Sequence, residues 1–304
     1  MDYRELLLLW AARETGVLEA ITVDVGTPEA VAAETGVTER AARVTIEALA
    51  DRGFLTRMGD EYEITNRALG FVTRTDVRSV GPVPHQLDCI ERARSLPETM
   101  RTGEPPAKPD DWTANRLGAI AATDEATIRA VVTAAVRERP DATAVLDVGG
   151  GPGVYAKEFV RRGFEVTLYE RPAVVEAVSG FLEHEPVELV AGERLGTLPD
   201  GFDLAFAATL THRLGPAENR RLVRNVADAL ELGGVAVFVD YVRGRSDFAT
   251  TAAAHALAQT RRGQSYEESE YVDWFESAGF ERPRVDDVPG TELQAITARR
   301  RAIQ

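Results

Sequence analysis

The sequence predicts an α/β fold with a mostly parallel, seven-stranded sheet, preceded by a mainly helical domain. An apolar run at residues 144–148 ends in four glycines within five residues, and a helical pattern begins near Val154. After residue 141, strand-like and helical segments alternate, which is typical of a parallel sheet wound by helices. Before that point helical patterns dominate. We expect a helical domain at residues 1–110 and an α/β domain at residues 111–304.

Composition and charge narrow the functional classes. The net charge is -14, and only two of the 35 basic residues are lysine. An acidic surface disfavours nucleic acid and anionic membranes as partners, because both need a cationic footprint. We interpret the lysine-poor, acidic composition as an adaptation to a high-salt cytoplasm.

Other features of the chain indicate the cellular compartment in which we expect the protein. The longest apolar run, residues 6–12, is far too short to span a bilayer, and we see no signal peptide. The single cysteine, Cys89, cannot form an internal disulfide, which fits a reducing environment. These observations predict a cytoplasmic protein.

The first elements are expected to be helices with clear caps. Residues 3–13 read as a helix that is apolar on most sides, and such a helix is buried, often against a partner. A second helix begins at Thr27, an N-cap followed by Pro28, and ends at Gly36. A third begins after Thr38 and ends at Gly53, with an apolar stripe of Ala41, Val44 and Ala48 beside Ile46 and Leu49.

A small hairpin is predicted next, at residues 54–57 and 62–65. Helix, turn, helix and hairpin together form a winged helix, a fold that often binds DNA. Here the second helix exposes charges of both signs and the hairpin tip is acidic, so few phosphate contacts are available. We therefore favour a folding and dimerisation module over a DNA-binding one.

Residues 79–111 are expected to be a proline-broken connector with one short helix at about 86–95. Helical stretches then start at Asp110-Asp111-Trp112 and at Asp124. In the α/β region, a helix from Pro216 carries Leu222, Val226, Ala229 and Leu230 on one face and stops at Gly233-Gly234. A last helix covers about 269–278. The predicted strands are residues 144–148, 165–169, 187–190, 203–207 and 235–240, with a terminal hairpin at 284–288 and 292–298.

The glycine turn after the first of these strands has three readings. A phosphate-binding P-loop needs Lys and then Ser or Thr after its last glycine, but Gly153 is followed by Val154 and Tyr155. A dinucleotide-binding fingerprint would need a glycine at Val154. The spacing Asp-x-Gly-x-Gly-x-Gly does fit, and it resembles the first motif of class I S-adenosylmethionine-dependent methyltransferases. Its residues here are Asp147, Gly149, Gly151 and Gly153.

Acidic residues after the next two strands extend this reading. Glu170 ends the second strand, where an acid can accept both ribose hydroxyls of a bound nucleoside. Residues 191–194 follow the third strand, and the resemblance implies that this turn meets the adenine. Glu193 and Arg194 are thereby expected to contact the cofactor. Asp203 opens the fourth strand and is expected to be structural.

Nearly the whole chain resembles the plant-type O-methyltransferase family, which includes caffeic acid and hydroxyindole O-methyltransferases. The resemblance implies a Rossmann-like class I methyltransferase domain, an N-terminal winged-helix dimerisation domain, a homodimer, and a small-molecule methyl acceptor with a hydroxyl group, most often aromatic. The matching stretches are residues 145–153, 169–172, 190–193, 210–212, 233–240 and 277–280.

The same resemblance assigns catalytic roles. His212 matches the family's general base, and histidine can remove a hydroxyl proton near neutral pH. Asp240, at the end of the fifth strand, sits where the family has an acid that orients the base. The chain departs from the family at Arg213 and Leu214, which replace Asp and Trp, and at Ser265, where a second orienting glutamate is expected.

Two matters stay open at this level. The acceptor pocket is expected to draw on Met100, Trp112, Asn115 and Trp274, and no cluster has metal-ligand spacing. An O-methyltransferase using S-adenosylmethionine is the leading hypothesis. There are three alternatives. The first is an N- or C-methyltransferase of the same fold. The others are a non-catalytic S-adenosylmethionine-binding regulator that uses the winged helix on DNA, and a scaffold that no longer binds cofactor.

Overall fold

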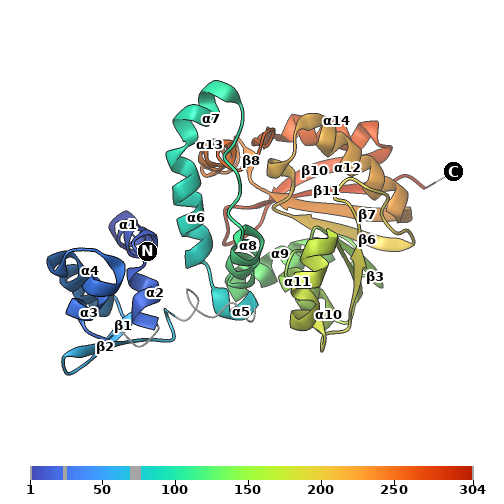
Figure 1. Cartoon of the computed structure of the whole chain (residues 1–304). Coiled ribbons are helices and arrows are strands. Elements are labelled where there is room, and N and C mark those ends of the chain that lie inside the picture. The colour runs from blue at the N-terminus through green and yellow to red at the C-terminus, as the bar shows by residue number, and fades with distance from the viewer. Residues whose placement is uncertain (1, 23–25, 69–76, 303–304) are drawn as a thin grey trace. The chain divides into compact units, whose positions relative to one another are not determined.

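The computed structural model of the chain describes residues 2–22, 26–68 and 77–302 (Figure 1). The chain divides into two compact units. The first comprises Met1–Glu91 with Lys108–Ala122, and the second comprises Arg92–Ala107 with Thr123–Gln304. The boundary expected between residues 110 and 111 stays a prediction.

The N-terminal part of the first unit has the predicted order of helices followed by a hairpin. Thr27 and Thr38 cap their helices as expected, because each side-chain oxygen accepts a backbone N–H of the first turn. A short helix after Gly16 was not predicted. The elements are α1 (Tyr3–Glu14), α2 (Val17–Thr22), α3 (Pro28–Thr35), α4 (Glu39–Asp51), β1 (Leu55–Met58) and β2 (Glu61–Ile64).

The buried face of α4 differs from the predicted stripe. Ala42, Ile46 and Leu49 are fully buried, whereas Val44 is 56% exposed. The two large side chains, Ile46 and Leu49, bury most apolar area and so decide which face turns inward; the alanines of the predicted stripe contribute little. Helix α1 is only partly buried within the single chain, because Leu9 is buried whereas Leu7 is 47% exposed; its predicted burial against a partner stays a prediction.

The predicted connector is more helical than its prolines indicated. Pro84 and Pro97 occupy the second positions of α6 (Val83–Arg94) and α7 (Leu96–Thr102). Proline is tolerated in the first helical turn, since the N–H that it lacks has no partner there in any case. Helix α7 belongs to the second unit, whereas α5 (Val77–Val80) and α8 (Trp112–Ala121) belong to the first.

The second unit is built on a seven-stranded sheet of order β10-β11-β7-β6-β3-β4-β5. The five strands from β3 to β7 are parallel to one another, and β11 and β10 add an antiparallel edge beside β7. The fold class predicted from the sequence is confirmed. The strands are β3 (Ala144–Val148), β4 (Glu165–Glu170), β5 (Val187–Ala191), β6 (Phe202–Ala208), β7 (Leu230–Asp240), β10 (Phe280–Asp287) and β11 (Gln294–Arg300).

Helices cover both faces of this sheet (Figure 1). Helices α9 and α10 pack on each other, as do α12 and α14. Shorter elements are the 3₁₀ turn η2 (Thr211–Arg213) and a small parallel pair, β8 (Val242–Arg243) and β9 (Tyr266–Glu267). The helices are α9 (Glu125–Glu138), α10 (Val154–Arg161), α11 (Pro172–Leu182), α12 (Pro216–Ala229), α13 (Ala249–Leu257) and α14 (Glu268–Ser277).

One predicted boundary is wrong in this region. Helix α12 ends at Ala229, Leu230 opens β7, and Gly233-Gly234 lie within that strand instead of terminating the helix. Leu230 is buried in the hydrophobic core as the first residue of β7. An apolar residue is expected there in either a helix or a strand, so its hydrophobicity did not distinguish the two.

The strand order places a topological switch between β3 and β6. From β3 the chain proceeds through β4 and β5 in one direction, and β6 and β7 lie on the other side. In open α/β sheets, ligands bind at the carboxyl ends of the strands beside such a switch. The glycine turn follows β3, and η2 follows β6, so both predicted half-sites meet there.

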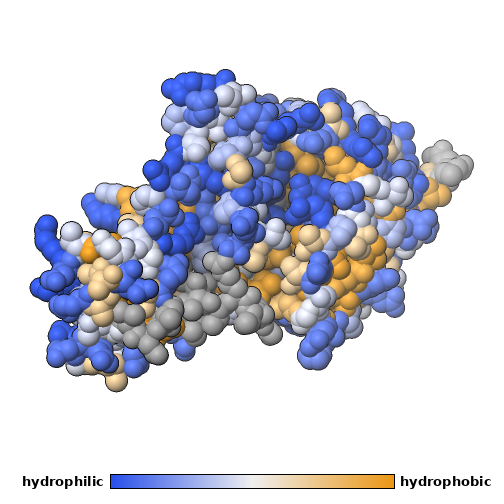
Figure 2. Space-filling model, viewed as in Figure 1, coloured by the Kyte–Doolittle hydropathy of each residue, from blue (hydrophilic) through white to orange (hydrophobic). Residues whose placement is uncertain are grey.

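Hydrophilic side chains cover most of the face seen in Figure 2, with apolar areas mainly over the elements of the second unit. This agrees with the high charged fraction of the sequence. Within the described residues, no helix has the length and apolar character needed to cross a bilayer.

Candidate active site

The glycine turn after β3 depends on a backbone that only glycine adopts easily. Gly149, Gly151 and Gly153 have φ values of 73°, 56° and 76°. Such left-handed conformations strain other residues. The Gly149 N–H donates to the Tyr169 carbonyl at 2.8 Å, which ties the turn to β4. The turn is therefore held in one conformation at the end of β3, next to β4.

Asp147 lies under this turn as a buried carboxylate. It is 1% exposed, and neither side-chain oxygen has a hydrogen-bond partner among the described residues. Burial, and then the nearby Glu170 carboxylate, raise the pKa of Asp147 to about 7. A buried acceptor without donors fits a ligand that brings N–H groups or positive charge to this spot.

Glu170 is placed where the sequence predicted, at the end of β4. It is 5% exposed, and its Oε1 accepts the Arg171 backbone N–H at 2.8 Å. The other oxygen is left for a ligand. Arg194 is near the same carboxylate: burial, and then the Arg171 guanidinium, lower the pKa of Arg194, while Glu170 opposes the shift. Glu193 is exposed on the turn after β5.

His212 and Asp240 are in direct contact, although 28 residues separate them in the sequence. Nδ1 of His212 lies 2.7 Å from Oδ1 of Asp240, and the histidine side chain is 19% exposed. An ionised carboxylate only accepts hydrogen bonds, so it selects the tautomer with the proton on Nδ1. Nε2 is then the acceptor available to a substrate.

Several donors keep Asp240 ionised. Its Oδ2 accepts from Oγ1 of Thr211 at 2.6 Å and from the His212 N–H at 3.1 Å. The Tyr241 N–H donates to Oδ1 at 2.9 Å. Burial alone would raise the pKa of Asp240, but the charge of His212 and these hydrogen bonds outweigh it and hold the pKa below its ordinary value.

Three aromatic side chains beside these groups were missed from the sequence. The Tyr241 ring lies 6.3 Å from the His212 ring and 5.0 Å from Phe248. Burial, and then the charge of Asp147, raise the pKa of Tyr155, with smaller contributions from Tyr241 and Asp240. Tyr155 thus lies between the two half-sites. A single Tyr or Phe carries no sequence signal for such a position.

The residues expected to line the acceptor pocket are not brought together within one unit. Trp112 and Asn115 are buried in the first unit, where Asn115 donates to Oδ2 of Asp88 at 2.8 Å. Met100, in the second unit, is 70% exposed. Trp274 is 2% exposed and packs against Tyr266 and Tyr271 in the hydrophobic core.

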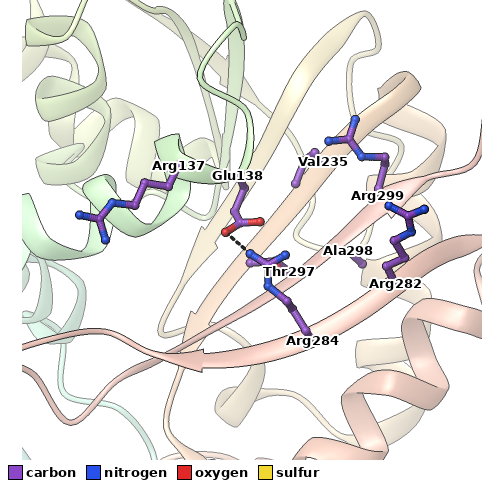
Figure 3. A pocket seen from close by; sticks show the side chains of 8 residues that line it. All are labelled: Arg137, Glu138, Val235, Arg282, Arg284, Thr297, Ala298 and Arg299. Atoms are coloured by element: carbon purple, nitrogen blue, oxygen red, sulfur yellow. Dashed lines mark hydrogen bonds and ion pairs between the residues drawn. The ribbon is translucent and has the colours of Figure 1, made fainter.

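A separate pocket of about 270 Å³ lies near the start of β7, away from the carboxyl ends of the parallel strands (Figure 3). None of the predicted site residues lines it. Arg284 bonds to Glu138 there. Its lining residues are Arg137, Glu138, Val235, Arg282, Arg284, Thr297, Ala298 and Arg299. In the part of the chain that is described, no group of His, Cys, Asp and Glu side chains could hold a metal ion.

Comparisons with known proteins agree with this geometry. The family model of the O-methyltransferase domain matches residues 118–281, more than half of the chain. Acetylserotonin O-methyltransferase of Mus musculus is 30% identical over 168 residues, covering 51% of this chain and 43% of the mouse protein. This chain therefore spans less than half the length of that relative.

Two further proteins are similar over most of their length. Mitomycin biosynthesis 6-O-methyltransferase of Streptomyces lavendulae is 24% identical, covering 89% of this chain and 86% of the relative. The structure of human N-acetylserotonin methyltransferase in complex with SAM superposes with a TM-score of 0.68 at 22% identity, covering 98% and 94% of the two chains. The chain therefore belongs to the O-methyltransferase family, whose members use S-adenosylmethionine.

Proposed function

We propose that this protein transfers a methyl group from S-adenosylmethionine to a hydroxyl group of a small aromatic molecule. The observation that carries the proposal is the 2.7 Å contact between Nδ1 of His212 and the buried Asp240 carboxylate. This pair stands beside the glycine turn, since the Leu210 side chain would lie 3.3 Å from a Cβ on Gly149. The proposed base, His212, and the glycine turn that would hold the nucleoside therefore lie next to each other, where the strand order reverses between β3 and β6.

The cradle residues fit the cofactor. The buried oxygens of Asp147, which have no donor among the described residues, suit its positively charged portion, and Glu170 suits the ribose hydroxyls. Glu193 and Arg194 are proposed to border the adenine. When bound, S-adenosylmethionine supplies an electrophilic methyl group on a positively charged sulfur.

The rest of the reaction depends on positioning and proton removal. Nε2 of His212 would take the proton of the acceptor hydroxyl, which leaves the oxygen free to accept the methyl group that bound S-adenosylmethionine would release from its sulfur. The Asp240 carboxylate stabilises the imidazolium that forms, because their atoms are already in contact. Tyr241 and Phe248 offer aromatic surface next to His212, which favours an aromatic acceptor.

Replacing the base tests this assignment. His212→Ala should lower kcat by about 10²–10⁴-fold, the usual contribution of general-base catalysis. The cofactor dissociation constant, measured by calorimetry, should stay within about twofold, because this side chain lies outside the cradle. The assay is methyl transfer to a panel of phenols, with matched anilines as competing acceptors.

His184→Ala is the matched control, since that histidine is 90% exposed in the same unit. It should leave kcat unchanged. Undiminished turnover in His212→Ala would remove the general-base role, and methylation of the anilines alone would move the activity to nitrogen.

We also propose that the protein is a homodimer formed through its N-terminal elements. The support is the apolar surface on α1, where Tyr3 and Leu7 are 63% and 47% exposed. Exposed apolar side chains on one helix are typical of an interaction surface.

A further inference from the structure

The turn that carries His212 starts from a strained residue. Thr209, between β6 and η2, has a φ of 49°. A β-branched side chain rarely adopts this left-handed conformation, and strain of this kind persists only where the surroundings impose it. The Thr209 N–H donates to the Val239 carbonyl at 2.8 Å, which ties the strained residue to β7.

Buried side chains from two other elements hold the end of the same turn. Nδ2 of Asn219, on α12, donates to the Thr211 carbonyl at 3.0 Å. The Tyr266 hydroxyl, on β9, donates to the Leu214 carbonyl at 2.5 Å. Asn219 and Tyr266 are fully buried. The backbone on both sides of His212 is therefore fixed.

A third contact reaches the carboxylate itself. The Tyr271 hydroxyl, on α14, lies 2.7 Å from Oγ1 of Thr211, which in turn lies 2.6 Å from Oδ2 of Asp240. All three residues are at most 2% exposed. Thr211 has one hydroxyl proton, and the ionised Asp240 can only accept, so Thr211 donates to Asp240 and Tyr271 donates to Thr211.

We propose that Tyr271 and Thr211 form a positioning relay for the catalytic base. The relay holds Oδ2 of Asp240 together with the His212 N–H, so that Oδ1 faces Nδ1 of the histidine and Nε2 is left for the acceptor. Buried hydrogen bonds in series strengthen one another, and each lost member leaves an uncompensated polar group. This inference rests on the proposed function, because the relay acts only through His212.

Three variants test the relay. Thr211→Val removes the donor to Asp240 and should lower kcat about tenfold, the effect of one hydrogen bond to a charged group. Tyr271→Phe removes the outer donor and should lower kcat about threefold. Thr211→Ser keeps the hydroxyl and should retain kcat within about twofold. The KM for the cofactor should stay within about twofold in all three.

The pH–rate profile separates positioning from simple loss of structure. In Thr211→Val the acid limb should move to higher pH, because Asp240 without this donor becomes a stronger hydrogen-bond acceptor and holds the imidazolium proton more tightly. Thr211→Ser should leave the limb in place. An unchanged kcat and profile in Thr211→Val and Tyr271→Phe would overturn the relay. So would an equal loss of kcat and of cofactor affinity, which would indicate a structural role.

A spectroscopic readout keeps the relay distinct from the proposed function. In the wild-type protein, the Nδ1 proton shared by His212 and Asp240 should give a downfield proton resonance. It should shift or broaden in Thr211→Val and persist unchanged in Thr211→Ser. If no phenol is methylated, the proposed function fails, while this resonance still decides whether Thr211 orders the histidine. An identical resonance in all variants would refute the relay.

Discussion

Asp147 couples the stability of the second unit to pH. Its carboxylate is buried beside Glu170, without a hydrogen-bond partner among the described residues. Burial and Glu170 raise its pKa from 3.8 to about 7. The folded protein therefore keeps a proton at this site over a pH range in which the unfolded chain has lost it. Between about pH 4 and pH 7, stability falls as pH rises, and above pH 7 this contribution stays lost.

Asp147→Asn should remove this pH dependence. The free energy of unfolding of the wild type, relative to the variant, should fall by roughly 3 kcal/mol between about pH 4 and pH 7.5. Denaturant titrations at several pH values measure the difference. Asp203→Asn is the control. The Thr143 backbone N–H lowers the pKa of Asp203, so the stability that Asp203 contributes should be lost as pH falls, the opposite of the Asp147 dependence. A wild-type-to-variant difference that does not change with pH would contradict the assignment.

The same substitution should cost function. The asparagine brings two N–H donors and no charge to a place that is proposed to face the positive portion of the cofactor. Compared with the wild type, Asp147→Asn should bind the cofactor more weakly and be more stable above pH 7. This combination is expected of a residue that serves binding at the expense of stability.

At the scale of elements, the turn between β3 and α10 is the part most sensitive to small changes. Gly150 has no special φ, yet a Cβ there would lie 2.4 Å from Oδ2 of Asp147. Real Cβ atoms do not approach this closely, so the carboxylate or the turn must move. The need for glycine at this position is steric, unlike the backbone requirement at Gly149, Gly151 and Gly153.

Gly150→Ala should therefore weaken cofactor binding by at least about tenfold, because misplacing one buried polar partner costs on the order of 1.4 kcal/mol or more. Calorimetry with S-adenosylmethionine measures the change. Gly180→Ala, in α11, is the matched control: a Cβ there meets nothing within 4 Å, and alanine favours a helix. It should bind normally and be up to about 1 kcal/mol more stable. Equal binding by both variants would show that the turn tolerates a Cβ.

At the scale of the whole molecule, the proposed homodimer makes a distinct prediction. Leu7→Glu places a charge in the exposed apolar surface of α1 and should convert the dimer into monomers in sedimentation velocity. Met58→Glu, on the hairpin, is the control, because Met58 is also an exposed apolar side chain at 56%. Monomeric wild-type protein, or a Leu7→Glu variant that stays dimeric, would exclude an interface on α1.

Local patterns in the sequence were enough to predict much of the fold. Apolar runs followed or preceded by glycine or proline marked the five parallel strands, because strand and turn preferences act over a few neighbouring residues. The terminal hairpin was predicted with its strands displaced by up to four residues from β10 and β11. Errors arose where one residue suits two elements, as with Leu230, or where large and small apolar side chains compete for a helix face, as on α4. Proline in a first turn was mistaken for a helix breaker at Pro84 and Pro97.

The sequence by itself determined the glycine turn and the acid at Glu170, because both lie at the ends of strands that local patterns mark. Its resemblance to the plant-type O-methyltransferase family implied that Asp240 orients His212. Only the tertiary structure decided what surrounds them. Tyr271 reaches Thr211 across 60 residues, and Trp274, three residues further along α14, turns into the core. Neither position has a local signal, since a side chain's partners depend on how distant helices pack on the sheet.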